Sequence, residues 1–117
     1  PGSAINITTT VFGEPVYGDL NGDGRDDAAL FLVYDPGGSG TFYYVAAAIT
    51  KNGNYQGTNA VLLGDRIAPR TINIRNKVIV VYYADRRPDE PMAAAPSIVK
   101  TMYPRLKKGR LEATEAP

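Results

Sequence analysis

The feature that most constrains this chain is a loop of alternating oxygen-bearing side chains that runs directly into a long apolar segment. Residues 12–34 have the sequence FGEPVYGDLNGDGRDDAALFLVY. Side chains at alternate positions of a tightly curled loop converge on one point, and hard oxygen ligands at that spacing suit Ca²⁺. The sequence therefore predicts a structural calcium site that leads into a β-strand. The predicted ligands are Asp19, Asn21, Asp23, the carbonyl of Arg25 and Asp27, at loop positions 1, 3, 5, 7 and 9, with Gly24 at position 6.

The loop departs from an EF-hand at its last position. Position 12 of an EF-hand is a bidentate Glu, whereas Leu30 stands there in this chain, and no helix is expected to follow. We expect weak binding, with a Kd on the order of 10⁻⁴ to 10⁻³ M. The alternative is a polar hairpin without a metal, because Asn21-Gly22 and Asp23-Gly24 are both turn dipeptides. Mg²⁺ fits less well, since it keeps most of its waters.

The rest of the pattern predicts an all-β fold, or a β-rich α+β fold. Short segments rich in β-branched and aromatic residues alternate with Gly, Pro and Asn turns, among which Asn52-Gly53 is typical of a type I′ hairpin. About seven strands at this spacing indicate an antiparallel meander that closes as a small sandwich or open barrel. The strands are expected at residues 5–12, 27–34, 41–50, 55–63, 71–74, 77–84 and 97–103, with a last short strand at Leu111.

The length of 117 residues favours one domain. We interpret residues 1–3 as a vector-derived remnant and residues 4–117 as a single β-rich domain. The chain has no Cys and no His, which removes disulfides, thiol nucleophiles, imidazole bases and the usual zinc ligands. The sequence contains no run of 18 apolar residues, so no transmembrane segment is expected. A protein without catalytic activity is the expectation.

Charge is distributed unevenly along the chain. Residues 1–60 carry two basic and six acidic side chains, whereas residues 61–117 carry eleven basic and six acidic ones. A basic segment at residues 100–110 could meet phosphates, but such a run is more often solvated, so nucleic-acid binding is not predicted. By default we expect a monomer.

Two further sets of residues are candidates for binding. Residues 85–96 form a Pro-rich loop of unusual length, in which Arg86, Asp89 and Glu90 could contact a partner, although a solvated loop is the better account of its carboxylates. The adjacent pairs Tyr43-Tyr44 and Tyr82-Tyr83 place one ring on each side of a strand, and Tyr44 and Tyr83 are candidates for an aromatic platform that binds a glycan or a protein. Ordinary half-buried packing is the alternative.

The loop resembles a known repeat. Phe12-Gly13, Val16, residues 18–24 and Asp27 are similar to the FG-GAP repeat of integrin-type β-propellers, whose DxDxDGxxD loop binds Ca²⁺ between two strands. A propeller needs several such blades, and this chain has one copy.

The longer context includes GDLNGDGRDDAALFLVYDPGGSGTFYYVAA at 18–47, VLLGDR at 61–66, DEPM at 89–92 and VKTMY at 99–103. With these motifs, residues 17–113 resemble a standalone domain of exported bacterial proteins and lipoproteins with no assigned activity. Paired Cys often follow the Pro-Met in that family, whereas residues 93–95 here are Ala.

This second resemblance implies an exported location, which could be periplasmic, lipoprotein-anchored or extracellular. The function we expect is that of a non-catalytic, calcium-stabilised β-domain with a binding or structural role at the cell envelope, where a protein or a glycan is a possible partner. The alternative is an enzyme or inhibitor domain that acts on cell-wall glycans through residues 85–96, with a carboxylate pair drawn from Asp85, Asp89 and Glu90.

Overall fold

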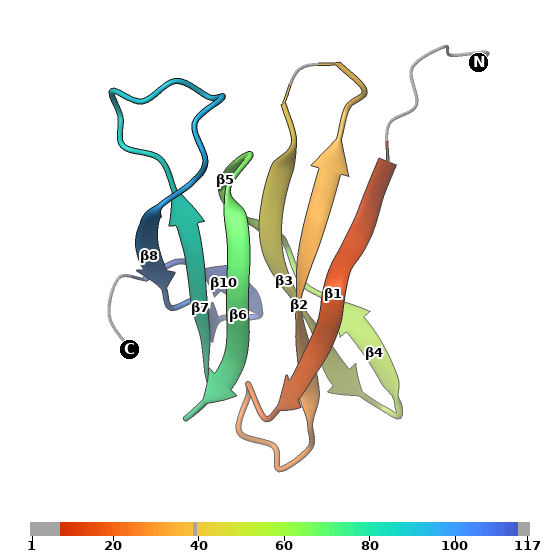
Figure 1. Cartoon of the computed structure of the whole chain (residues 1–117). Helices are drawn as coiled ribbons and strands as arrows, with labels where there is room; N and C mark the ends of the chain where they lie inside the picture. Colours follow the sequence, from red (N-terminus) through yellow and green to blue (C-terminus); the bar gives the residue numbers. More distant parts are fainter. Residues whose placement is uncertain (1–7, 39, 115–117) are drawn as a thin grey trace, which may run out of the picture.

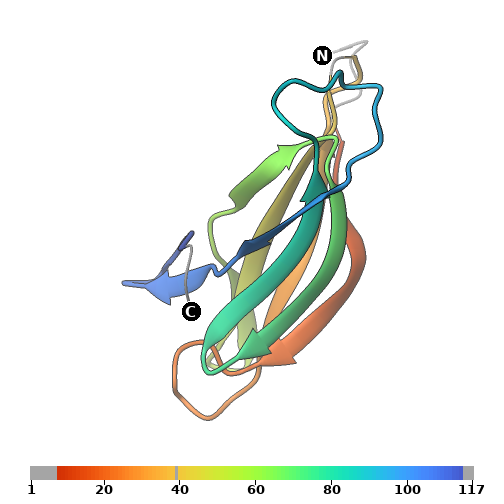
Figure 2. The same ribbon diagram turned by 60° about the vertical axis from the view of Figure 1, so that its left-hand side comes forward.

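The computed structural model describes residues 8–38 and 40–114, which form two antiparallel sheets of five strands each (Figures 1 and 2). These residues contain ten strands and no helix, so the predicted all-β fold is confirmed. The sheets form a sandwich-like arrangement that is not closed into a barrel. The overall dimensions of 44 × 40 × 23 Å suit two sheets packed face to face.

The first sheet is a meander whose last strand is interrupted. It has the order β1-β2-β3-β4, and β5 pairs with the same strand as β4, namely β3. Residue pairing shows that β4 lies along one end of β3 and β5 along the other. The strands are β1 (Thr8–Gly18), β2 (Asp27–Asp35), β3 (Phe42–Lys51), β4 (Asn54–Gly57) and β5 (Val61–Asp65).

The second sheet repeats this plan with the order β10-β9-β7-β6, and β8 also pairs with β7. β8 pairs with the end of β7 and β9 with its start at Val78. Pro104, which has no N–H to donate, lies fully buried between β8 and β9. The strands are β6 (Ala68–Arg75), β7 (Val78–Asp85), β8 (Ile98–Met102), β9 (Arg105–Lys107) and β10 (Arg110–Glu112).

Alternate residues of both sheets fill one core, as the two-residue period of a strand requires. In β7, for example, Ile79, Val81 and Tyr83 point into the core, and the first two are completely buried. The first sheet contributes a matching set from its inner face. The core cluster consists of Leu20, Ala29, Phe31, Val45, Ala47, Leu63, Ile67, Ile72, Ile79, Val81, Tyr83 and Leu111.

The two sheets are joined along both pairs of edges. On one side, β1 meets β6 so closely that a Cβ at Gly18 would lie 2.8 Å from Cγ2 of Ile74. On the other side, the side-chain amide of Asn59 bonds to the backbone of Leu111 in β10. Its Nδ2 donates to the Leu111 carbonyl at 3.0 Å, and its Oδ1 accepts from the Leu111 N–H at 2.8 Å. Asn59 therefore replaces a peptide group in linking the sheets.

Most of the predicted strands are found, and the differences have local causes. The strand expected at residues 55–63 is divided because Thr58 turns its hydroxyl to the β3 backbone, where Oγ1 accepts from the Ala47 N–H at 3.1 Å. The type I′ turn is supported by positive φ at both Asn52 (52°) and Gly53 (81°). The first predicted strand starts at residue 5; residues 5–7 of it, like the 1–3 remnant, lie outside the described residues, and the observed strand continues to Gly18.

Candidate metal site

The predicted calcium loop connects β1 to β2 at one end of the molecule (Figures 1 and 2), and three of its carboxylates converge. One carboxylate oxygen from each of Asp19, Asp23 and Asp27 lies within 4.8 Å of the others. This spacing allows a single cation to contact all three, and carboxylate oxygens are the ligands that hard cations such as Ca²⁺ prefer. The donor set therefore could hold a metal ion.

Backbone hydrogen bonds to Asp19 curl the loop. Its Oδ1 accepts from the N–H of Asn21 at 3.2 Å and of Gly22 at 2.7 Å, and its Oδ2 accepts from the N–H of Gly24 at 2.9 Å. Gly24 has φ of 81°, an angle that a residue with a Cβ rarely adopts, which is why glycine stands at the sixth position. The loop is thus preformed by its own side chains.

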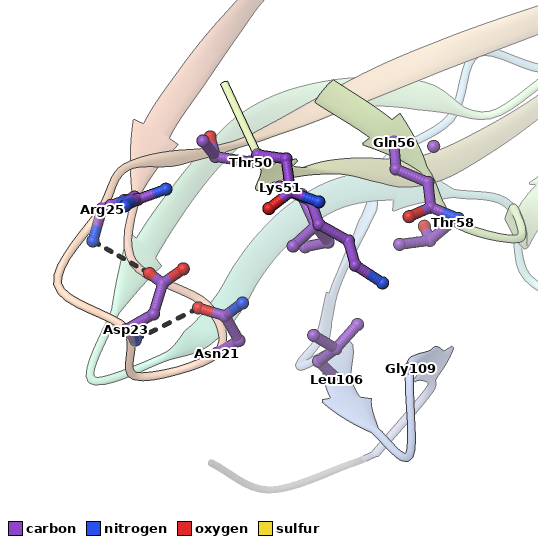
Figure 3. A pocket seen from close by; sticks show the side chains of 12 residues that line it. Asn21, Asp23, Arg25, Thr50, Lys51, Gln56, Thr58, Leu106 and Gly109 are labelled. Atoms are coloured by element: carbon purple, nitrogen blue, oxygen red, sulfur yellow. Dashed lines mark hydrogen bonds between the residues drawn. The ribbon is translucent and has the colours of Figure 1, made fainter. Parts of the chain in front are cut away.

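The middle of the loop is shaped by two more bonds of the same kind. Asn21 Oδ1 accepts from the N–H of Asp23 at 3.2 Å, and Asp23 Oδ1 accepts from the N–H of Arg25 at 2.9 Å (Figure 3). All three residues are exposed. Each carboxylate or amide oxygen has a second lone pair, so these bonds leave capacity for a cation.

Asp27 differs from the other two carboxylates because it is completely buried. Its Oδ2 accepts from the N–H of Leu20 at 2.8 Å, which ties the start of β2 to the segment just after β1. Its Oδ1 accepts from the N–H of Thr50 in β3, also at 2.8 Å. A buried charge requires partners of this kind. Asp27 therefore fixes the loop against the sheet, and it is both a candidate ligand and a structural anchor.

The negative charge of Asp19 would attract a cation to the loop, whereas the positive charge of Lys77 would repel it. The backbone N–H of Gly24 is the main cause that holds the pKa of the Asp19 carboxyl below its usual value, so this group is ionised at neutral pH. The Lys77 ammonium, from the β6–β7 turn, approaches the loop at Gly22, where a Cβ would lie 3.1 Å from Nζ. A cation bound by the aspartates would have this ammonium as a neighbour.

Part of the loop also forms one wall of an open pocket of about 570 Å³ (Figure 3). The facing walls come from the β3–β4 hairpin and the β9–β10 hairpin, so three segments distant in sequence meet there. Thr50, whose N–H donates to Asp27, was not predicted as part of this site. It lies 23 residues from Asp27, and no local sequence pattern indicates their contact. The labelled lining residues are Asn21, Asp23, Arg25, Thr50, Lys51, Gln56, Thr58, Leu106 and Gly109.

The long loop after β7 lies at the opposite end of the molecule from the β1–β2 loop (Figures 1 and 2). Arg86 is engaged in shaping it: its Nε donates to the Ala94 carbonyl at 2.6 Å and its Nη1 to the Arg66 carbonyl at 2.7 Å. Glu90 Oε1 accepts from the N–H of Arg87 at 2.7 Å, while Asp89 is exposed. The candidate binding residues of this loop are therefore not brought near the aspartates.

The two candidate tyrosines lie on different sides of their sheets. Tyr83 points into the core, where it is 7% exposed and burial raises the pKa of its hydroxyl, so the exposed ring of that pair is Tyr82. Tyr44 is half-buried on the outer face of the first sheet, in a cross-strand row with Leu32 and Leu62. Only Tyr44 of the two is placed to contribute to an outer surface.

Comparison of the chain with protein-family models, with curated proteins and with solved structures finds no match. The residues described by the structure include no helix long and apolar enough to cross a membrane. The class defined here is an all-β domain of two five-stranded sheets that carries an acidic triad between its first two strands.

Proposed function

We propose that this protein is a non-catalytic β-domain whose β1–β2 loop binds Ca²⁺ as a structural ion. The observation that carries the proposal is the convergence of Asp19, Asp23 and Asp27 within 4.8 Å. The alternating oxygen ligands and the positive φ of Gly24 support calcium over a bare turn, because this ligand chemistry and curl suit a large, hard cation. The missing acidic ligand at Leu30 favours weak binding.

The ion would add to the bonds that already hold the loop to the sheet. Asp27 already connects the loop to β3 through Thr50, and a cation on the remaining lone pairs would add Asp19 and Asp23 to the same connection. Its role is then to stiffen one end of the sandwich beside the open pocket. This role suits a domain exposed to millimolar calcium, which is the basis for proposing an exported protein. The resemblance of residues 17–113 to a standalone domain of exported bacterial proteins also implies export.

At the cell envelope we propose a binding or structural role, with a protein or a glycan as partner. The alternative function, an enzyme or inhibitor domain that acts through residues 85–96, gains no support from the carboxylates there. Asp85 accepts from Lys100 Nζ at 3.1 Å and Glu90 bonds within its own loop. Fractionation of the producing cells tests the proposed location, and recovery of the native chain only in the cytoplasm would contradict it.

Calcium-dependent stability tests the function directly. At free Ca²⁺ ten times Kd, mass action stabilises the native state by about 1.4 kcal/mol, which corresponds to about 5 °C in Tm. The measurement is thermal unfolding in chelator, in millimolar Ca²⁺ and in Mg²⁺ at matched ionic strength. Equal melting temperatures in chelator and in Ca²⁺ would overturn the proposal.

A pair of variants locates the ion. Asp23→Ala removes an exposed member of the triad and is expected to abolish the calcium response. Asp26→Ala removes an equally exposed carboxylate from the same loop but outside the triad, so its response should remain. Loss of the response in both variants, or in neither, would place the ion elsewhere.

A further inference from the structure

A second pocket, of about 410 Å³, lies on the outer face of the second sheet, away from the core. Its floor is formed by Val78 and Val80, which alternate with the core residues Ile79 and Val81 and therefore point outward. Although they face outward, the two valines are only 7% and 8% exposed, because longer side chains surround them. The volume falls within the range of small-molecule sites.

Two arginines flank this floor in one cross-strand row. Arg75 of β6 is opposite Val78, and Arg105 of β9 is opposite Val78 on its other side. Residues directly opposite one another share a face of the sheet, so both guanidinium groups project on the outer side. With neighbouring strands about 4.8 Å apart, their backbones lie about 10 Å from each other. Both side chains line the pocket.

Neither arginine of this row forms an ion pair among the described residues. Within residues 8–38 and 40–114, the only ion pairs join Asp65 to Arg66 and Asp85 to Lys100. Glu112 is opposite Arg105 in β10, yet it forms no ion pair with it. No acidic residue lines the pocket.

Arg105 also carries an unsatisfied donor. Its Nε is buried and has no hydrogen-bond partner among the described residues. Buried donors in native proteins are nearly always paired, so an unpaired one beside a pocket indicates a missing acceptor.

The two aromatic rings of the pocket, Tyr82 and Tyr103, add flat apolar surface with a hydroxyl at the end.

We propose that this pocket binds an organic carboxylate that carries a compact aromatic or aliphatic group. The guanidinium forks of Arg75 and Arg105 match the planar geometry of a carboxylate, and charged hydrogen bonds of this kind are the strong ones. The valine floor and the tyrosine rings receive the apolar group. The carboxylate belongs either to a small acid or to the C-terminus of a peptide. This site is independent of the β1–β2 loop and of the proposed calcium role.

Nuclear magnetic resonance titration of the full chain tests the proposal, with benzoate as the probe and benzamide as its neutral counterpart at constant ionic strength. Benzoate is expected to shift the signals of Val78, Val80 and Tyr82 in a saturable manner, and benzamide is not. Equal shifts with both probes, or no saturable shift with benzoate, would overturn the proposal.

Two peptide probes then identify the source of the carboxylate: N-acetyl-Ala-Phe with a free C-terminus and its C-terminal amide. Tighter binding of the free acid than of benzoate assigns a chain terminus, and weaker binding assigns a small acid.

Matched arginine variants locate the binding. Arg105→Gln and Arg75→Gln should each weaken the affinity for benzoate at least tenfold. Arg110→Gln, in β10 and outside the pocket lining, should leave that affinity unchanged. Arg105→Lys keeps the charge but loses the fork, so a weakening is also expected. Arg75 is exposed, so its variant carries the test if Arg105→Gln does not fold. An Arg110→Gln loss equal to the other two would show nonspecific attraction to positive charge and would contradict the site.

Discussion

Asp27 and Thr50 are joined by a hydrogen bond of 2.8 Å, in which the backbone N–H of Thr50 donates to Oδ1 of the buried carboxylate. The two residues lie 23 positions apart, at the start of β2 and near the end of β3. The Thr50 hydroxyl adds a second connection, because it donates to the carbonyl of Asp26 at 2.6 Å. The β1–β2 loop is therefore fixed to the sheet by protein contacts alone.

Asp27→Ala should destabilise the fold strongly even without a metal. The substitution leaves the N–H groups of Leu20 and Thr50 without their acceptor, and each buried unpaired donor costs about 1–3 kcal/mol. We expect a loss of about 2–4 kcal/mol in the free energy of unfolding, measured by urea denaturation in chelator. Asp26→Ala, which removes an exposed neighbouring side chain, is the control and should change stability by less than about 0.5 kcal/mol. Equal losses would contradict the anchoring role of Asp27.

Asn59→Ala should loosen the edge where the β9–β10 hairpin meets the first sheet. Leu111 loses a partner for both its N–H and its carbonyl, for a cost of about 1–3 kcal/mol. Hydrogen exchange at the Leu111 amide should become faster, while exchange in β7 should change only with global stability. Asn73→Ala, at an exposed position of β6, is the matched control. Unchanged exchange at Leu111 would show that the side-chain bridge does not hold this edge.

Gly18→Ala should disturb the close approach of β1 and β6. The added Cβ would lie 2.8 Å from Cγ2 of Ile74 and 2.9 Å from its Cβ, so the sheets must shift, at a cost of about 1–3 kcal/mol. Gly57→Ala in β4 is the control, since a Cβ there meets nothing within 4 Å and should be neutral or slightly stabilising. Thermal unfolding of both variants distinguishes the two sites, and a neutral Gly18→Ala would mean that the edges are not in tight contact.

Stability should fall in acid partly through Asp85. Partial burial raises the pKa of this carboxyl, but the N–H of Arg86 and the Lys100 ammonium outweigh it, so its pKa is below the ordinary value in the folded state. A depressed folded-state pKa gives stability that is present above the unfolded-state pKa of about 4 and is lost as pH falls through the folded-state value. Urea midpoints at pH 7 and pH 3 should therefore differ less for Asp85→Asn than for the unchanged chain. If the midpoints at the two pH values differ equally in Asp85→Asn and in the unchanged chain, the Asp85–Lys100 pair does not contribute to the acid sensitivity.

The sequence alone predicted the features that depend on local geometry. The alternating oxygens and Gly24 predicted the curled loop, because the bonds that Asp19, Asn21 and Asp23 accept span at most five positions. The apolar run after Asp27 predicted β2, whose observed bounds are Asp27–Asp35. The Asn52-Gly53 dipeptide predicted its turn, because few residues tolerate two successive positive φ angles.

The tertiary structure decided what depends on register between distant segments. The pairing of strands placed Thr50 beside Asp27, Asn59 beside Leu111, and Val78 between Arg75 and Arg105. It also decided that Tyr83 is the buried ring and Tyr82 the exposed one, since a shift of one residue would exchange the two faces. Residue type and spacing determined the loop and most of the strands in this protein, whereas the long-range packing of the two sheets determined which side chains meet, because no local pattern encodes a contact between residues so far apart in the chain.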